Sequence, residues 1–521
     1  MNLFDGLRHQ AKLNPDRPAI SCGESKFSYG EFHDRVVKLG NALLGLEVKK
    51  GDRVAALLLN CHRYLELYYA TALIGAVIVP LNYRLAPKEL VYIMNDSESE
   101  TLFVDQDLWE HIKPVYAELD TLKRTCFTGG AGEVPSGMQR YEKLIKDSAT
   151  KMPDVEVQDS DLAGIFYTGG TTGLAKGVML SHGNLLSNSH HLLINMPVGK
   201  DEVYCHAAPM FHLANGGAMY GNTANGSKHT FLKVFDAGAV LELISKEKVT
   251  STVLVPAMIN FVLNQPDIAE QDLSSLKRII YGASPMPAQL LKEGIKVFGC
   301  DFVQGYGMTE ASPLLTVLYP EDHHIEGPEK LTRRLLSCGR EIIGVEVRVV
   351  DDRGHDVSPG EVGEIIARGP NIMQGYWKKE AETKAVLING WYYSGDMGTV
   401  DEDNYIFLVD RKKDMIISGG ENIYSTEVEN ALYTHPDVFE AAVIGVPDEK
   451  WGEAVKGIVV LKPESRATAA ELIQHCREQI AAFKVPKSID FISELPKSGA
   501  GKVLKRDLRE KYWKGQQRRI S

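Results

Sequence analysis

The sequence lacks the cysteine and histidine pairs from which disulfide frameworks and zinc sites are built. Its seven cysteines are scattered, and no two of them form a Cys-x-x-Cys pair. None of its 15 histidines lies in a His-Glu-x-x-His motif or pairs with a cysteine at zinc-ligand spacing. These patterns indicate a reducing compartment and no transition-metal site.

An excess of basic residues is also missing. The formal net charge is −11, whereas proteins that bind nucleic acid in general usually present a basic surface. We therefore expect no nucleic-acid partner. An anionic substrate would need local basic groups, because the overall field of the protein does not attract it.

No stretch of the sequence is typical of a signal peptide or a membrane span. The N-terminal segment carries charged residues in its first turns. The most apolar uncharged run lies between Glu66 and Arg84, and it is interrupted by Gly75 and Pro80. That run reads better as a buried helix followed by a strand, so we expect a cytoplasmic protein without a transmembrane segment.

The chain does contain a long alternation of strand-like and helix-like segments. Its 521 residues exceed what one compact core accommodates, so two or more domains are expected. Apolar strands alternate with helices through the first 300 residues or so, as in 278–281 and 288–298, which predicts parallel α/β sheets. From residue 345 short strands joined by turns predict an antiparallel, barrel-like part. Beyond residue 410 the pattern changes to a small α+β domain, which gives domains 1–410 and 411–521.

A glycine- and threonine-rich loop lies between an apolar strand and a helix at 182–195. Residues 167–177 read YTGGTTGLAKG, with four glycines, three threonines and one lysine. Glycine backbone N–H groups, threonine hydroxyls and a lysine charge together suit a polyphosphate. The spacing is not that of a Walker A loop, because Leu174 follows Gly173. A flexible linker is the alternative, but threonines and lysine are not typical of one.

A second glycine-rich segment, QGYGMTE, occupies residues 304–310. Its two glycines allow close backbone approach, Tyr306 offers an aromatic face for a purine, and Thr309 and Glu310 offer hard oxygens for Mg²⁺. Taken alone, the segment would more simply be a buried turn. Its position downstream of the glycine- and threonine-rich loop favours the functional interpretation.

Single polar residues mark three further places. Asp396 ends the segment GWYYSGD at 390–396, where it is either a turn residue or an acceptor for two sugar hydroxyls. His212 ends PMFH, and a lone histidine is more often structural than catalytic. Lys502 follows two glycines in PKSGAGKVLKR, whose loop could reach another domain. The basic residues around it are interpreted as a solvated tail: Lys505, Arg506, Arg509 and Lys511.

Taken in order from residue 167 to 506, these motifs resemble the adenylate-forming (AMP-binding) acyl-CoA synthetase family. The resemblance covers essentially the whole chain, and one departure is Ala175, where the family usually has proline. It implies that a carboxylic acid reacts with MgATP to give acyl-AMP and pyrophosphate, and that the thiol of coenzyme A then displaces AMP. ATP, Mg²⁺ and coenzyme A are thus the expected cofactor and co-substrates.

The resemblance also assigns roles to residues. It implies four catalytic residues: Lys502, Glu310, Thr309 and His212. It implies a nucleotide site that includes the YGASP turn at 281–285: Thr168, Gly169, Gly170, Thr171, Thr172, Gly173, Lys176, Gly282, Ala283, Ser284, Gly305, Tyr306, Gly307, Asp396 and Arg411. It implies metal ligation by Thr168 and Glu310, and an acyl pocket lined by His212, Gly305 and Met308.

The C-terminal domain is expected to be a mobile lid. The resemblance places its hinge at Lys413 and coenzyme A contacts at Ser418, Gly419, Gly420 and Glu421. Two alternatives remain open: transfer of the acyl group to a carrier protein, and a non-catalytic nucleotide-binding module. A serine hydrolase built on Ser274 and Lys277 has no supporting motif. The sequence leaves open which acid is activated and whether the chain forms a homodimer.

Overall fold

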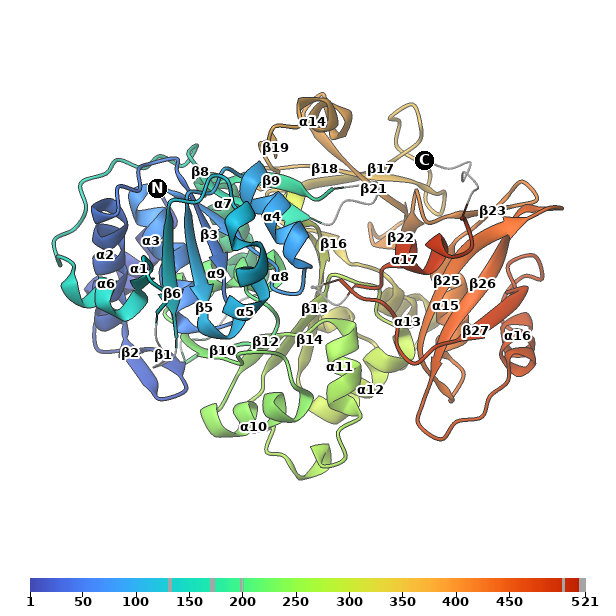
Figure 1. Cartoon of the computed structure of the whole chain (residues 1–521). Helices are drawn as coiled ribbons and strands as arrows, with labels where there is room; N and C mark the ends of the chain where they lie inside the picture. The colour runs from blue at the N-terminus through green and yellow to red at the C-terminus, as the bar shows by residue number, and fades with distance from the viewer. Residues whose placement is uncertain (130–133, 169–173, 197–198, 200, 499–501, 515–521) are drawn as a thin grey trace.

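The computed structural model describes residues 1–129, 134–168, 174–196, 199, 201–498 and 502–514. Within these residues the strands form four sheets, and Figure 1 shows the chain passing from two large sheets into an upper sheet and then a separate C-terminal unit. No helix of the described part is long and apolar enough to cross a membrane. The run between Glu66 and Arg84 instead forms the end of a buried helix and a buried strand, as predicted.

The first large sheet carries the loop at 167–177. Its strands, in spatial order, are β19 (Gly375–Tyr376), β9 (Lys176–Ser181), β8 (Leu162–Thr168), β4 (Val77–Pro80), β3 (Arg53–Leu57), β5 (Thr101–Asp105), β6 (Arg124–Thr128) and β7 (Gln139–Arg140). The strands from β8 to β7 pair in parallel. Their apolar residues pack in part against helices α2 (Tyr29–Gly45) and α3 (His62–Ile74), so the buried core lies between these layers.

The second large sheet is parallel from β1 through β14. Its order is β16 (Arg340–Glu341), β15 (Leu314–Leu318), β14 (Asp301–Gly307), β13 (Arg278–Gly282), β12 (Ser251–Val253), β10 (Val203–His206), β11 (Lys228–Phe231), β1 (Pro18–Cys22) and β2 (Ser25–Ser28). Residues of α10 (Ala237–Glu247), α11 (Pro256–Leu263) and α12 (Ala288–Phe298) share its apolar core. The predicted α/β class with parallel sheets is therefore confirmed.

The third sheet is antiparallel and curled. It contains β17 (Glu346–Val350), β18 (Gly363–Arg368), β21 (Trp391–Val400), β20 (Leu387–Ile388) and β22 (Ile406–Arg411). This is the part that the sequence predicts as barrel-like. Its strand β22 ends at Arg411, where the chain leaves for the C-terminal unit.

The C-terminal unit has the predicted α+β composition. Its sheet contains β24 (Glu421–Ile423), β23 (Ile416–Ser418), β26 (Gly452–Leu461), β25 (Val438–Asp448) and β27 (Ser488–Phe491), with helices α15 (Ser425–Tyr433), α16 (Ala469–Arg477) and α17 (Lys505–Glu510). Thr468 and Glu471 form a capping box at the start of α16. The helix ends at Arg477, and just beyond it the amide of Gln479 bonds to the Cys476 carbonyl three residues back, as in a tighter turn.

The remaining α-helices are α1 (Asp5–Leu13), α4 (Pro87–Asp96), α5 (Trp109–Ile112), α6 (Tyr141–Asp147), α7 (His182–Asn195), α8 (Leu213–Gly216), α9 (Ala218–Asn225), α13 (Glu329–Thr332) and α14 (Glu380–Val386).

Candidate active site

The glycine- and threonine-rich loop joins two paired strands. β8 and β9 run antiparallel, and Thr168 lies opposite Lys176 at the last pair of the ladder. The two residues that flank the loop tip thus belong to hydrogen-bonded strands. The predicted nucleotide contacts at the tip lie outside the described residues: Gly169, Gly170, Thr171, Thr172 and Gly173.

A tyrosine connects this loop to the predicted metal ligand. Lys176 Nζ lies 5.1 Å from the ring centre of Tyr376, and the Tyr376 hydroxyl donates a hydrogen bond of 2.9 Å to Glu310 Oε1. Burial raises the pKa of Glu310, partly offset by the hydrogen bond from Tyr376. Sequence reasoning missed Tyr376 because it belongs to no motif; strand β19 brings it to β9 from two hundred residues away.

Two strand ends form the expected adenine side of the site. β13 and β14 pair in parallel with Gly282 beside Gly305, so their carboxyl ends lie at one edge of the sheet. A Cβ atom on Gly282 would lie 2.1 Å from the Gly305 carbonyl oxygen, and one on Gly307 would lie 1.8 Å from that of Pro313. These positions therefore require glycine. Ala283, next to Gly282, has a positive φ of 65° that turns the chain toward Ser284.

The segment after β14 carries three predicted residues. Met308 is half-buried, and Thr309 and Glu310 begin a short 3₁₀ helix, Thr309–Ala311. The backbone carbonyl of Glu310 accepts a hydrogen bond of 2.8 Å from the amide of Met373, just before β19. This bond fixes the backbone beside the loop hairpin.

Asp396 lies at the centre of a polar cluster. It faces Arg411 across the β21–β22 pair, and Arg411 Nε lies 3.1 Å from Asp396 Oδ1. The hydroxyl of Tyr306 donates a hydrogen bond of 3.0 Å to Asp396 Oδ2. Asp396 and Tyr306 are both buried, and the Tyr306 ring packs with apolar neighbours such as Leu314. Asp396 is therefore a supported acceptor rather than an isolated turn residue.

Lys502, in the C-terminal unit, interacts electrostatically with this cluster. Burial and the charge of Arg411 lower the pKa of Lys502 to about 8, against the opposing charge of Asp396. Burial and then the charge of Lys502 lower the pKa of His212 to about 4. Lys502 thus lies close enough to act electrostatically on both sides of the site. Its loop is closed by the bond from the Ser498 amide to the Lys502 carbonyl, 2.7 Å; Gly499 and Gly501 lie outside the described residues.

A buried asparagine, Asn60, holds the loop that carries His212. Asn60 Nδ2 donates to the carbonyls of His206 and Ala208 at 3.1 and 2.9 Å, and Asn60 Oδ1 accepts from the amide of Met210 at 2.8 Å. His212 itself caps the short helix α8 through its Nδ1. Sequence reasoning missed Asn60, which lies in an otherwise apolar region without a motif.

The predicted hinge and coenzyme A residues lie where the chain enters the C-terminal unit. Lys413 belongs to the turn between β22 and β23, and strands β23 and β24 form a hairpin in which Ser418 faces Glu421. Gly419 and Gly420 make its turn with φ of 62° and 90°, a conformation that favours glycine. Their contact with coenzyme A stays a prediction.

The interpretation of the C-terminal basic residues as a solvated tail is wrong for two of them. Lys505 Nζ lies 2.7 Å from Glu429 Oε1, and Arg509 Nη2 lies 2.7 Å from Asp414 Oδ1. The side chains of Lys505 and Arg509 are only 15% and 13% exposed. Their acidic partners lie 76 and 95 residues away in the sequence, too far for a local charge pattern to indicate them. Arg506 and Lys511 are exposed, as predicted.

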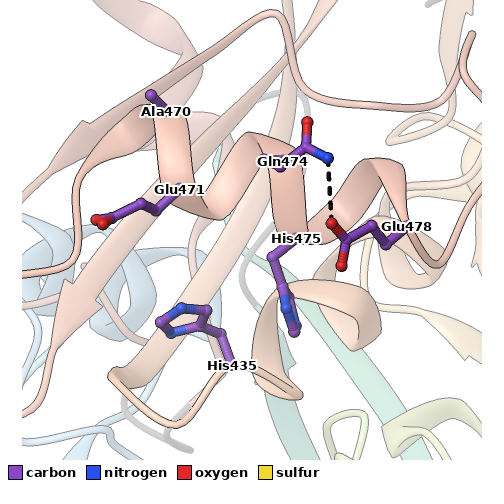
Figure 2. A pocket seen from close by; sticks show the side chains of 6 residues that line it. All are labelled: His435, Ala470, Glu471, Gln474, His475 and Glu478. Atoms are coloured by element: carbon purple, nitrogen blue, oxygen red, sulfur yellow. Dashed lines mark hydrogen bonds between the residues drawn. The ribbon is translucent and has the colours of Figure 1, made fainter.

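One surface hollow of the described structure lies on the C-terminal unit, away from the predicted site residues. It is lined mainly by helix α16, and Figure 2 shows the ring of His475 beside that of His435 and a hydrogen bond from Gln474 to Glu478. The two histidine rings are 5.0 Å apart and nearly perpendicular. The hollow contains none of the residues predicted to bind nucleotide.

Comparison with known proteins identifies the same family as the motifs do, over nearly the whole chain. Sequence models of the AMP-binding enzyme family and of the AMP-binding enzyme C-terminal domain match residues 7–377 and 427–502. The chain is 40% identical to a feruloyl-CoA synthase from an Amycolatopsis species, over 96% of this chain and 97% of that protein. It is 36% identical to an indoleacetate–CoA ligase from Aromatoleum aromaticum, over 98% of both. The structure of o-succinylbenzoate CoA synthetase from Bacillus subtilis, solved with its acyl-adenylate intermediate, superposes with a TM-score of 0.83 at 29% identity, covering 98% of both chains.

Proposed function

The chain belongs to the AMP-binding enzyme family and is an AMP-forming acid–CoA ligase, and from that premise we propose that the acid it activates carries an aromatic ring. The observation that carries the reaction is the convergence of Asp396, Glu310 and Lys502. The charge of Asp396 acts on the pKa of both Glu310 and Lys502, although the three residues come from separate parts of the chain.

The aromatic acid is supported by two observations. The similar proteins named above act, by name, on ferulate, indoleacetate and o-succinylbenzoate, each of which contains an aromatic ring. Phe211, next to His212, packs edge-to-face with Tyr83 at a ring distance of 5.5 Å. Aromatic side chains in this geometry offer a planar acid favourable ring contacts.

In the first half-reaction a carboxylate oxygen of the acid attacks the α-phosphorus of ATP, and pyrophosphate leaves. Negative charge grows on the phosphoryl oxygens, and Lys502 in its ammonium form stabilises it from one side. From the opposite side, Lys176 and the loop at 167–177 hold the phosphates in line with the attacking carboxylate. His212, uncharged at neutral pH because its pKa is lowered, lines the acid side without repelling Lys502.

Glu310 and Thr168 would hold Mg²⁺. The described residues contain no group of three or more His, Cys, Asp or Glu side chains able to hold an ion. Mg²⁺, however, is commonly bound by one or two carboxylates together with phosphate oxygens of the substrate, and Glu310 fits that mode. When bound, the ion neutralises charge on the phosphates. Tyr376 orients the carboxylate of Glu310 through its hydrogen bond.

Asp396 and Arg411 would bind the ribose. A carboxylate can accept hydrogen bonds from both sugar hydroxyls, and Tyr306 and Arg411 hold it in place. The adenine would lie against the turn that starts at Gly282, at the strand end where Gly282 lies against the Gly305 carbonyl.

In the second half-reaction the thiol sulfur of coenzyme A attacks the acyl carbon, and AMP leaves. We place a mobile lid at 411–521 and its hinge at Lys413, which lies between the two segments matched by the family models. Rotation there would withdraw Lys502 and present the hairpin containing Ser418–Glu421 to coenzyme A.

Product analysis over a panel of acids tests this function. Cinnamic, arylacetic, benzoic, short-chain and long-chain acids are each incubated with ATP and Mg²⁺, with coenzyme A, with a phosphopantetheinylated carrier protein, or with neither. We expect thioester formation with coenzyme A and the highest kcat/KM for a ring-containing acid. Preference for a long-chain acid would contradict the aromatic proposal, and acyl transfer only to the carrier would contradict coenzyme A as the acceptor.

A further inference from the structure

We propose that Asp410, Ser425 and Lys505 form a chain of positioning residues that holds Lys502 in the nucleotide site during adenylation. The inference rests on the proposed role of Lys502. None of the three residues is predicted to touch ATP, the acid or coenzyme A, so they act on the reaction through the placement of Lys502.

The chain begins on the last strand before the hinge. Asp410 lies near the end of β22, and its Oδ2 accepts hydrogen bonds from the backbone amide and the hydroxyl of Ser425, at 2.6 and 2.7 Å. Ser425 is the first residue of α15. One carboxylate oxygen of the N-terminal part therefore binds two donors at the start of a helix of the C-terminal part.

The second link leads from Ser425 to the catalytic segment. Lys505 Nζ donates a hydrogen bond to the hydroxyl of Ser425 and pairs with Glu429 at 2.7 Å. Lys505 is the first residue of α17 and stands three positions after Lys502. The path from Asp410 to the segment of Lys502 thus consists of two consecutive contacts, both through Ser425.

Burial makes these contacts strong. Ser425 is fully buried and Asp410 is 9% exposed, and hydrogen bonds to a charged acceptor are stronger when water is excluded. Burial alone would lower the pKa of Lys505, but the carboxylates of Glu429 and Asp410 raise it. Lys505 is therefore charged at neutral pH.

Only part of this network crosses the hinge. Asp410 precedes Lys413, whereas Ser425, Glu429 and Lys505 follow it. Rotation at Lys413 would carry Ser425 away from Asp410 while Lys505 keeps its contacts with Ser425 and Glu429. The two bonds to Asp410 therefore favour the adenylation arrangement specifically. Among the other described contacts between the two parts, the bond from Asn260 to the Phe439 carbonyl is longer, 3.3 Å, and uncharged.

Substitution of Ser425 by proline removes both donors while preserving the helix. The first position of a helix accepts proline, because its N–H makes no intrahelical bond. The preceding residue, Tyr424, already has the extended conformation that proline requires, with φ of −90° and ψ of 122°. Ser425→Thr is the matched control, because threonine keeps the amide and the hydroxyl.

The test measures both half-reactions. For Ser425→Pro we expect pyrophosphate release from acid plus ATP to fall about tenfold or more, as for the loss of a hydrogen bond to a charged acceptor. Thioester formation from synthetic acyl-AMP should change less than about twofold, a difference between the steps that general destabilisation would not produce. The control Ser425→Thr, which keeps both donors, should release pyrophosphate at about the rate of the parent protein. Asp410→Asn, which weakens the acceptor, serves as the second variant if Ser425→Pro does not fold, and the same difference between the steps is expected.

Lys502→Ala, assayed in parallel, separates failure of this inference from failure of the proposed function. If Lys502→Ala loses adenylation while Ser425→Pro and Asp410→Asn keep it, the positioning chain is refuted and the role of Lys502 stands. Equal loss of both half-reactions in folded Ser425→Pro likewise refutes it. If Lys502→Ala retains adenylation, the proposed role of Lys502 is wrong and the inference that rests on it is wrong too.

Discussion

Replacement of Asp396 by alanine should weaken ATP binding and destabilise the fold by two separable effects. In the structure Asp396 accepts the hydroxyl of Tyr306 at 3.0 Å and pairs with Arg411 at 3.1 Å. Its proposed task adds the two ribose hydroxyls. Hydrogen bonds to a charged acceptor contribute about 1.5–3 kcal/mol, so the dissociation constant for ATP should rise about tenfold to somewhat over a hundredfold.

The stability effect arises from the groups that Asp396→Ala leaves behind. The Tyr306 hydroxyl, on a side chain that is 8% exposed, would lose its acceptor, and a buried donor without a partner costs about 1–3 kcal/mol. Tyr306→Phe removes that donor and leaves the carboxylate in place. The double variant should therefore recover part of the unfolding free energy but none of the ATP affinity.

Calorimetric titration with ATP and thermal unfolding of the three variants measure these two effects separately. We expect weak ATP binding wherever Asp396 is absent, and ATP binding much closer to that of the parent protein in Tyr306→Phe. Unchanged ATP affinity in a folded Asp396→Ala protein would show that this carboxylate does not bind the ribose.

Three further predictions concern the metal, the proton and the hinge. Glu310→Gln should keep part of its ATP binding and lose most pyrophosphate release, and parental rates across a Mg²⁺ titration would contradict the ligand assignment. The pKa of Lys502 is lowered to about 8, so the lysine loses its charge as the pH rises through that value. We therefore expect kcat/KM for adenylation to decline near pH 8. A pH profile that stays flat well above pH 8 would refute the electrostatic role of Lys502. Lys413→Pro, which fixes φ, should spare pyrophosphate release and reduce acyl transfer from acyl-AMP to coenzyme A, whereas normal rates of both would place the hinge elsewhere.

Much of the fold could be predicted because its elements are set by local patterns. The helix predicted at 288–298 has the same bounds in the structure, as α12, and so does the helix at 182–195, as α7. Both have clear boundaries in the sequence, such as Gly299 after α12 and the cap residue Ser181 before α7. Alternation of such helices with apolar strands was sufficient to predict parallel sheets.

Contacts between distant residues could not be predicted in the same way. Tyr376 and Glu310 are 66 residues apart, and Lys505 and Ser425 are 80 residues apart. No period or motif of a single sequence indicates that such pairs meet, because strand order and domain arrangement determine them. The motifs therefore indicate which residues are candidates for binding ATP, and the structure adds the residues that orient them.

The two half-reactions of Lys502→Ala test most directly the proposal that this lysine completes the adenylation site and leaves it for acyl transfer. Pyrophosphate release is measured with the acid and ATP, and acyl-CoA formation is measured with synthetic acyl-AMP and coenzyme A. We expect the first activity to be lost and the second to be retained. Retained pyrophosphate release, or equal loss of both activities in a folded protein, would contradict the proposal.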